Sequence, residues 1–297
     1  MAVFCCGSLH LDVLVTAPHL PRPDETVAGN TVEYIFGGKG GNQALSASKM
    51  GSKVSMAGRV GSDSFGNHLL KELKNSTIDI SQVQRDDGPS GMSVAILDSA
   101  GNYGAVIVSA SNLNIDPELV IVPADTKIIL LQNEISEDVN LALAQKGRII
   151  GSKVILNAAP ARAFNKNILD FVDLLVVNRV EAEDILGHEV SSDGWFAAVE
   201  ELAKLGPNEL IMTLGADGLI IKIGVQAPVH IRAHNVTVKS THGAGDMFLG
   251  ALAAHLDQNM SLLSACHFAQ KAAALHVGSQ QSERKKLTKE AVLNYNP

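Results

Sequence analysis

Short, uninterrupted apolar runs in the second half of the chain limit its fold more than any other feature of the sequence. The runs Lys127–Leu131, Lys153–Leu156 and Leu174–Val177 show no alternation of polar and apolar residues, which is typical of strands covered on both faces in a parallel sheet. Two further strand-like runs follow, Leu210–Leu214 and Leu219–Ile223. Helical patterns lie between these runs or after them: Asp138–Lys146, Glu181–Leu186, Trp195–Leu205, Asp246–His255 and Leu262–Val277. We therefore expect an α/β fold with a doubly wound, mostly parallel sheet between layers of helices.

Length and composition agree with one such domain over residues 1–297. Hydrophobic residues make up 46% of the 297 residues and charged residues 19%, which excludes intrinsic disorder. The formal net charge of −7 is unfavourable for binding the phosphates of nucleic acids, so we expect no nucleic-acid partner. No run approaches the ~20 apolar residues of a membrane-spanning helix, and the N-terminus lacks the basic region of a signal peptide. We expect a cytoplasmic protein with no membrane partner.

The three cysteines, Cys5, Cys6 and Cys266, all lie in apolar runs. An odd number of cysteines without C-x-x-C spacing argues against a disulfide framework and against a zinc site. We expect them to be small buried core residues.

Two early segments interrupt the alternation of strands and helices. Thr31–Phe36 alternates like a half-exposed strand, and Met92–Asp98 and Tyr103–Val108 flank Ser99-Ala100-Gly101-Asn102, a hairpin signal. We expect a small antiparallel flap, or lid, whose strands fall within about residues 12–37 and 91–110. The alternative is an antiparallel extension of one edge of the main sheet.

Polar residues end several of the predicted parallel strands. Gln132-Asn133-Glu134, Asn157, Asn178 and Thr213 stand at or near their carboxyl ends, where ligands bind in open α/β sheets. One such residue alone could be a helix cap, whereas several at one edge favour a ligand site.

The most specific local feature is the segment Ser240–Gly250. A strand-like approach at Val236–Val238 leads into Gly243-Ala244-Gly245 and then an apolar helix. Backbone N–H groups at such a glycine-rich helix start form an anion hole suited to phosphate. Asp246, in the first turn, is either an N-terminal cap or a general base for phosphoryl transfer. The chain has neither a P-loop nor a G-x-G-x-x-G fingerprint after its first strand.

Two N-terminal segments complete the candidate set. Gly37-Gly38-Lys39-Gly40-Gly41 brings the backbone close to a polar partner, or else is a flexible surface turn. In the extended segment Gly7–Val13, His10 and Asp12 share one face. That pair is suited to binding sugar hydroxyls, but a solvent-facing edge strand would look the same.

These segments, in this order, resemble the ribokinase / phosphofructokinase-B family of ATP-dependent carbohydrate kinases, and within it the chain is most similar to the ribokinases. Asn157-Ala158-Ala159-Pro160-Ala161, Asn178-Arg179-Val180-Glu181 and Thr213–Gly218 match as well. The resemblance covers nearly the whole chain. It implies transfer of the γ-phosphoryl group of Mg·ATP to a primary hydroxyl of a small carbohydrate, with ribose the leading candidate. A ketohexose, a nucleoside or pseudouridine as acceptor, and a catalytically weak sugar sensor, are the alternatives.

The resemblance also implies a role for each matching residue. Asp246 becomes the catalytic base, and Gly243, Ala244 and Gly245 the anion hole. Sugar contacts are assigned to His10, Asp12, Gly38, Lys39, Asn42 and Glu134. Nucleotide contacts are assigned to Asn178, Thr213, Leu214, Gly215, Ala216, Asp217, Gly218 and Gln270. Glu181 is placed where the family organises magnesium, through water.

The chain departs from the ribokinase pattern at three places. His10 replaces a usual Asn, and Ser240 replaces a usual Asp that helps to hold an activating monovalent cation. Val277–Gln280 replaces a longer, Arg-containing turn. We therefore expect ATP and Mg²⁺ but leave the monovalent cation open.

Two expectations concern surfaces. In ribokinases the lid builds a dimer, so the resemblance implies a homodimer. The short basic run Ser282–Lys289 is expected to be a solvated turn and helix start, and a docking site is the alternative.

Overall fold

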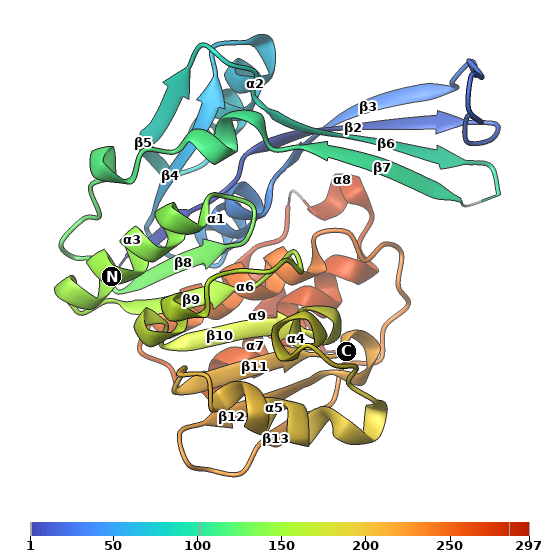
Figure 1. Cartoon of the computed structure of the whole chain (residues 1–297). Helices are drawn as coiled ribbons and strands as arrows, with labels where there is room; N and C mark the ends of the chain where they lie inside the picture. The colour runs from blue at the N-terminus through green and yellow to red at the C-terminus, as the bar shows by residue number, and fades with distance from the viewer. Residues whose placement is uncertain (1, 101, 285, 297) are drawn as a thin grey trace.

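A nine-stranded sheet forms the centre of the computed structural model, which describes residues 2–100, 102–284 and 286–296 (Figure 1). Its strand order is β13-β12-β11-β10-β9-β8-β1-β4-β5. All neighbours from β5 to β11 are parallel, and β12 and β13 add two antiparallel pairs at one edge. The strands are β1 Val3–Cys6, β4 Val54–Gly61, β5 Asp79–Asp86, β8 Ile128–Gln132, β9 Lys153–Asn157, β10 Leu174–Asn178, β11 Glu209–Thr213, β12 Leu219–Ile223 and β13 Val229–Ile231.

Helices cover both faces of this sheet. They are α1 Lys39–Lys49, α2 Ser64–Lys74, α3 Glu137–Ile150, α4 Arg179–Leu186, α5 Trp195–Ala203, α6 Ala244–Asp257, α7 Leu262–Gly278, α8 Gln281–Arg284 and α9 Lys289–Asn294. Short 3₁₀ turns are η1 Ala110–Asn114, η2 Pro117–Leu119, η3 Lys166–Phe171, η4 Ser192–Gly194 and η5 Gly215–Asp217. Within the described ranges, no helix has both the length and the apolar character needed to cross a bilayer.

The central strands are buried on both faces, as their unbroken apolar runs predict. Ile128 and Leu130 of β8 belong to the core cluster that includes residues of α1, α2, α6 and α7. Ile129 and Leu131 belong to the opposite cluster, with residues of α3, α4 and α5. The neighbours Cys5 and Cys6 divide between the two clusters in the same way, and all three cysteines are free and buried. The expected doubly wound α/β fold is confirmed.

A second, four-stranded sheet projects from the main body as a lid (Figure 1). Its order is β3-β2-β6-β7, with β2 His10–Ala17, β3 Thr31–Gly37, β6 Gly91–Asp98 and β7 Tyr103–Val108. It is a separate sheet and not an extension of the main one. The outer pairs are antiparallel, but the central pair, β2 and β6, is parallel. The β6–β7 hairpin forms as expected, and Gly101 of its turn lies outside the described residues.

The strand expected at Val236–Val238 is wrong. These residues form no strand, and the last strand before them, β13, ends at Ile231. The chain that follows runs beside the end of α7, where the N–H groups of Lys239 and Ser240 donate to Val277 O at 2.8 and 3.4 Å.

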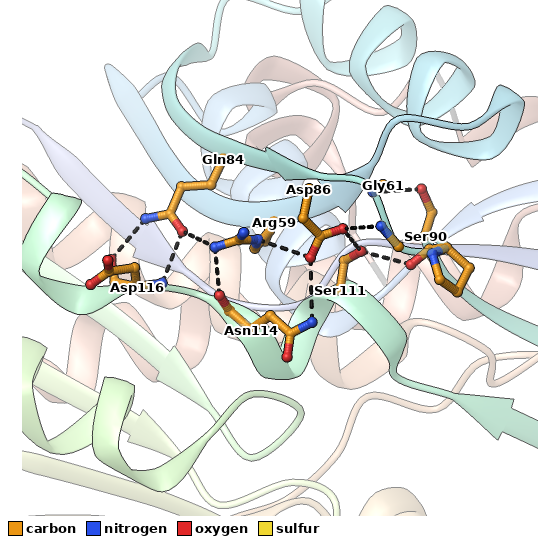
Figure 2. A network of polar contacts seen from close by, with 10 residues as sticks. Arg59, Gly61, Gln84, Asp86, Ser90, Ser111, Asn114 and Asp116 are labelled. Carbon is orange, nitrogen blue, oxygen red and sulfur yellow. Dashed lines mark hydrogen bonds and ion pairs between the residues drawn. The ribbon is translucent and has the colours of Figure 1, made fainter.

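A polar network fastens the base of the lid to the main sheet (Figure 2). Arg59 of β4 pairs with Asp86 of β5 (Nε–Oδ2 3.1 Å) and donates to Asn114 O at 2.7 Å. Ser111, just beyond β7, donates to Asp86 Oδ1 at 2.8 Å. Burial acts to raise the pKa of Asp86, but hydrogen bonds from Ser111, Asn114 and the Gly88 N–H, together with Arg59, outweigh it and lower the pKa. The carboxylate therefore stays charged and keeps both ends of the β6–β7 hairpin in place.

A very close approach of α1 and α6 joins the start of the chain to its C-terminal half. A Cβ atom at Gly250 of α6 would lie 2.4 Å from Ser46 Cβ and 2.6 Å from Gln43 O, both of α1. The two helices thus pack backbone against backbone, which only glycine at position 250 permits.

We expect Gly250→Ala to destabilise the protein by about 1–3 kcal/mol, the cost typical of overpacking a close-packed core. Gly278→Ala, in α7, is the matched control, because its Cβ would meet nothing closer than Thr237 O at 3.8 Å. Urea unfolding of both variants measures the difference. Equal stability of the two would show that the helices separate without cost.

Candidate active site

A pocket of about 190 Å³ lies at the carboxyl ends of β9, β10 and β11, against the start of α6. Asn157, Asn178 and Thr213, each at the end of a strand, line it. The same wall includes Lys39, Glu181, Gly243, Ala244, Gly245 and Asp246. Segments from both halves of the chain therefore meet at one edge of the sheet.

Two of the expected rim residues are structural instead. Gln132 and Asn133 are buried, and their side-chain amides donate to Leu130 O (3.3 Å) and Ala158 O (2.9 Å). Glu134, the next residue, remains partly exposed.

The glycine-rich turn before α6 presents backbone donors to the pocket. Gly243 is the N-cap, with a left-handed φ of 74° and no side-chain cap bond. The Ala244 N–H donates to Thr241 O at 3.1 Å, whereas among the described residues the N–H groups of Gly243 and Gly245 have no acceptor. A Cβ at Gly245 would meet nothing within 4 Å. Gly243 and Gly245 therefore have open N–H donors where the sequence predicts an anion hole, whereas the Ala244 N–H is already satisfied.

Asp246 lies in the first turn of α6 but does not cap it. Its carboxylate accepts hydrogen bonds from Gln43 Nε2 at 3.0 Å and Asn42 Nδ2 at 3.3 Å, both on α1. Burial raises the pKa of Asp246 to about 6, although Lys39 and the Gln43 amide act to lower it. A carboxylate with such a pKa is ionised at neutral pH and accepts a proton more readily than an ordinary aspartate.

Lys39 supplies positive charge between the acidic groups of the site. Its ammonium lies 3.6 Å from Glu134 Oε1. Burial acts to lower the Lys39 pKa, but the carboxylates of Glu134, Asp246 and Glu181 outweigh it and raise the pKa. The Lys39 side chain therefore remains charged in the wall of the pocket.

The residues assigned to the sugar gather at the base of the lid and the start of α1. Glu134 Oε2 accepts the Lys39 N–H at 2.9 Å and the Ser8 hydroxyl, so it caps α1, whose N-cap Gly38 has no side chain. Asp12 accepts the Ser93 hydroxyl. His10 is buried; burial lowers its pKa, and its Nε2 has no hydrogen-bond partner in the described part of the chain.

On the nucleotide side, two assigned residues also form a helix cap. Asn178 Oδ1 accepts the Glu181 N–H at 2.9 Å, and Glu181 Oε2 accepts the Asn178 N–H at 2.7 Å, which is a capping box at the start of α4. Both still line the pocket. Burial raises the pKa of Glu181.

The remaining nucleotide assignments divide into two groups. The loop after Thr213, which contains Leu214, Gly215, Ala216, Asp217 and Gly218, begins beside the pocket because Thr213 lines it, but none of these five residues belongs to its wall. Gln270 of α7 does not line the pocket either; it is buried and donates to Ile231 O at 3.3 Å.

Two side chains near Asp246 have no role in the sequence-based assignment. Gln43, fully buried, holds the Asp246 carboxylate; its place on the apolar face of α1, beside Ala44 and Ala47, was an available signal. Arg284 was expected in a solvated turn, and this is wrong, because the structure buries it. Its partners are backbone carbonyls distant in sequence, which no sequence pattern announces.

Comparison with known proteins identifies the family of this chain. A family model described as pfkB family carbohydrate kinase matches residues 2–289. The chain belongs to this family. It is 32% identical over 275 residues to a ribokinase of Lactococcus lactis, covering 91% of this chain and 89% of that protein. It is 30% identical over 292 residues to a deoxyribokinase of Salmonella typhi, covering 95% of each. The structure of Arabidopsis thaliana ribokinase complexed with ribose and ATP superposes with a TM-score of 0.89 at 28% identity, over 98% of this chain and 97% of that one.

We expect Lys39→Met to raise the pKa of Asp246 above about 6, because the ammonium favours the charged carboxylate. An NMR titration of the Asp246 carboxyl carbon measures this directly. Lys204→Met, which removes an exposed ammonium at the end of α5, is the control and should leave that pKa unchanged. A fall in the Asp246 pKa after Lys39→Met would refute the proposed coupling.

Proposed function

We propose that this protein is an ATP-dependent sugar kinase that transfers the γ-phosphoryl group of Mg·ATP to a primary hydroxyl of ribose. The observation that carries the proposal is the position of Asp246: a half-buried carboxylate of raised pKa in the same pocket as the open N–H groups of Gly243 and Gly245. General base and anion hole are the two groups that phosphoryl transfer to an alcohol requires of a protein.

The proposed mechanism assigns one task to each of these groups. Asp246 takes the proton of the acceptor hydroxyl, while Gln43 and Asn42 hold its carboxylate in one orientation. The N–H groups of Gly243 and Gly245 stabilise the charge on the equatorial oxygens of the transferred group. Lys39 offsets part of the same charge and keeps Asp246 ionised. The lid sheet, whose strand β2 carries His10 and Asp12 near its base, is suited to excluding water when it closes.

The residues of the pocket fit a magnesium ion that arrives with ATP. Among the described residues, no cluster of three or more His, Cys, Asp or Glu could hold a metal, and magnesium commonly binds through one or two carboxylates, substrate phosphates and retained waters. Glu181 offers such a carboxylate in the pocket wall, and both its oxygens already accept hydrogen bonds from Asn178, so contact through water suits it. When bound, the ion neutralises phosphate charge.

Ribose leads among acceptors because the relatives named above include ribokinases, one of them complexed with ribose and ATP. The deoxyribokinase relative makes 2-deoxyribose the second candidate, and the unpartnered His10 Nε2 gives this site a polar group of its own for a hydroxyl. The deciding experiment measures ADP release with ribose, 2-deoxyribose, a ketohexose, a nucleoside and pseudouridine. The highest kcat/KM for ribose supports the proposal. Turnover with none of them would favour a sugar sensor on a kinase scaffold.

We expect Asp246→Asn to lower kcat by roughly 10²–10⁴, the range for loss of a general base. Asp138→Asn is the matched control, because Asp138 also lies in the first turn of a helix, α3, outside the pocket. Steady-state kinetics of both variants with the best acceptor measures the effect. Near-normal turnover of the Asp246 variant would exclude its assignment as the base.

A homodimer formed through the lid is a further part of the proposal. Tyr34 pairs with Val13, Val13 with Val94, and Val94 with Val106, so these four side chains share one face of the lid sheet. Tyr34 is 58% and Val106 67% exposed. An apolar row of this kind is suited to burial against a second copy, and sedimentation velocity distinguishes dimer from monomer.

We place the enzyme in the cytoplasm. Free, buried cysteines suit a reducing compartment, and the proposed co-substrate is ATP.

A further inference from the structure

Arg284, the last residue of α8, is a buried cation whose partners are all backbone carbonyls. Only 7% of the residue is exposed. Its Nη2 donates to Ser240 O at 2.7 Å and its Nη1 to His242 O at 3.0 Å. Its Nε donates to His276 O at 3.1 Å and Ser279 O at 3.3 Å. The guanidinium thus closes the junction between the loop before α6 and the end of α7.

Among the described residues, no carboxylate pairs with this guanidinium. None of the ion pairs among residues 2–100, 102–284 and 286–296 includes Arg284. Burial lowers its pKa, but arginine remains protonated in proteins. Four carbonyl oxygens converging on one positive charge resemble the environment that backbone carbonyls give a dehydrated monovalent cation.

The carbonyls that Arg284 holds lead directly into the anion hole. The His242 C=O and the Gly243 N–H belong to one peptide unit, and a planar trans peptide points them in opposite directions. A bond from Arg284 to His242 O therefore fixes the direction of the Gly243 N–H, one of the two open donors. His276 Nε2 lies 2.9 Å from the same oxygen. Arg284 and Asp246 also line one cavity of about 530 Å³, on the side of the glycine turn that faces α1 and α2.

We propose that Arg284 is a positioning residue that acts as a built-in monovalent cation: its guanidinium orients the Gly243 peptide and adds a fixed positive charge beside the anion hole. The inference rests on the proposed phosphoryl transfer. It accounts for Ser240, because a carboxylate at that position would pair with the guanidinium and cancel its charge. It also implies that the enzyme needs no bound potassium.

The first test uses the unmodified protein. Initial rates with saturating sugar and Mg·ATP are compared in chlorides of potassium, sodium and tetramethylammonium at equal ionic strength. We expect the rates to differ by less than about twofold, because the fixed charge of arginine is independent of the salt. Activation by potassium of about fivefold or more would overturn the inference, since it would mean that backbone carbonyls of this enzyme bind a potassium ion.

The second test replaces the guanidinium. Arg284→Met should lower kcat by about tenfold or more, as expected when an anion-hole donor is misplaced, with KM for the sugar changed by less than about threefold. Added guanidinium ion should restore part of the lost rate, which it would not do for a general loss of stability. Arg284→Lys, which keeps the charge but not the planar donors, should fall between.

Arg85→Met is the matched control for these variants. Arg85 also donates to a backbone carbonyl, Gly61 O at 3.1 Å, but lies on β5, away from both cavities. It should lose no kcat and gain nothing from guanidinium. Unchanged kcat in Arg284→Met, or equal rescue of the control, would overturn the inference.

The outcomes separate the inference from the proposed function. If the unmodified protein phosphorylates no acceptor, the proposed function has failed. If it is active but depends on potassium, only the role of Arg284 has failed. If Arg284→Met does not fold, as its urea unfolding curve would show, the salt comparison on the unmodified protein still decides.

Discussion

The backbone contact between α1 and α6 sets the geometry on which the site depends. Because position 250 is glycine, the Gln43 carbonyl and Ser46 occupy space that a side chain on α6 would fill. The Gln43 amide then reaches the Asp246 carboxylate, 203 residues away in sequence. Two helices that each begin in a glycine turn are thereby brought together at their N-termini. Their first-turn N–H groups and aligned dipoles favour negative charge there, as a phosphoryl donor requires.

Much of the fold could be predicted from the sequence because burial on both faces leaves an unmistakable pattern. The runs at β8, β9 and β10 are apolar at every core position, and the residues that end β10 and β11, Asn178 and Thr213, do line the pocket. The prediction failed where backbone groups form hydrogen bonds that do not belong to a sheet. Val236–Val238 has strand-like residues but forms no strand, and Arg284 has the charged side chain typical of a surface residue but donates to four backbone carbonyls.

Several residues show that a structural role and a role in the site are not alternatives. Asn178 and Glu181 cap α4 through reciprocal hydrogen bonds and also line the pocket. Glu134 caps α1 in place of the side chain that Gly38 lacks. Capping fixes a carboxylate or amide in one rotamer, which is the pre-organisation that a binding site needs. The same residue types serve as helix caps and as ligand contacts, so the sequence alone does not separate the two roles. The positions of the neighbouring elements show whether one residue has both.

Positively charged side chains from both ends of the chain lie near the carboxylates of the pocket. Glu134, Glu181 and Asp246 bring three carboxylates near a pocket suited to a still more anionic ligand, and Lys39 offsets part of their charge from the N-terminal side. A second cation on the C-terminal side, held by carbonyls and not by a carboxylate, adds its field without cancelling it. An ion pair at Arg284 would have given the buried charge a partner but would have removed that field. The neutral residue at position 240 and the buried arginine at position 284 are therefore two parts of one electrostatic arrangement.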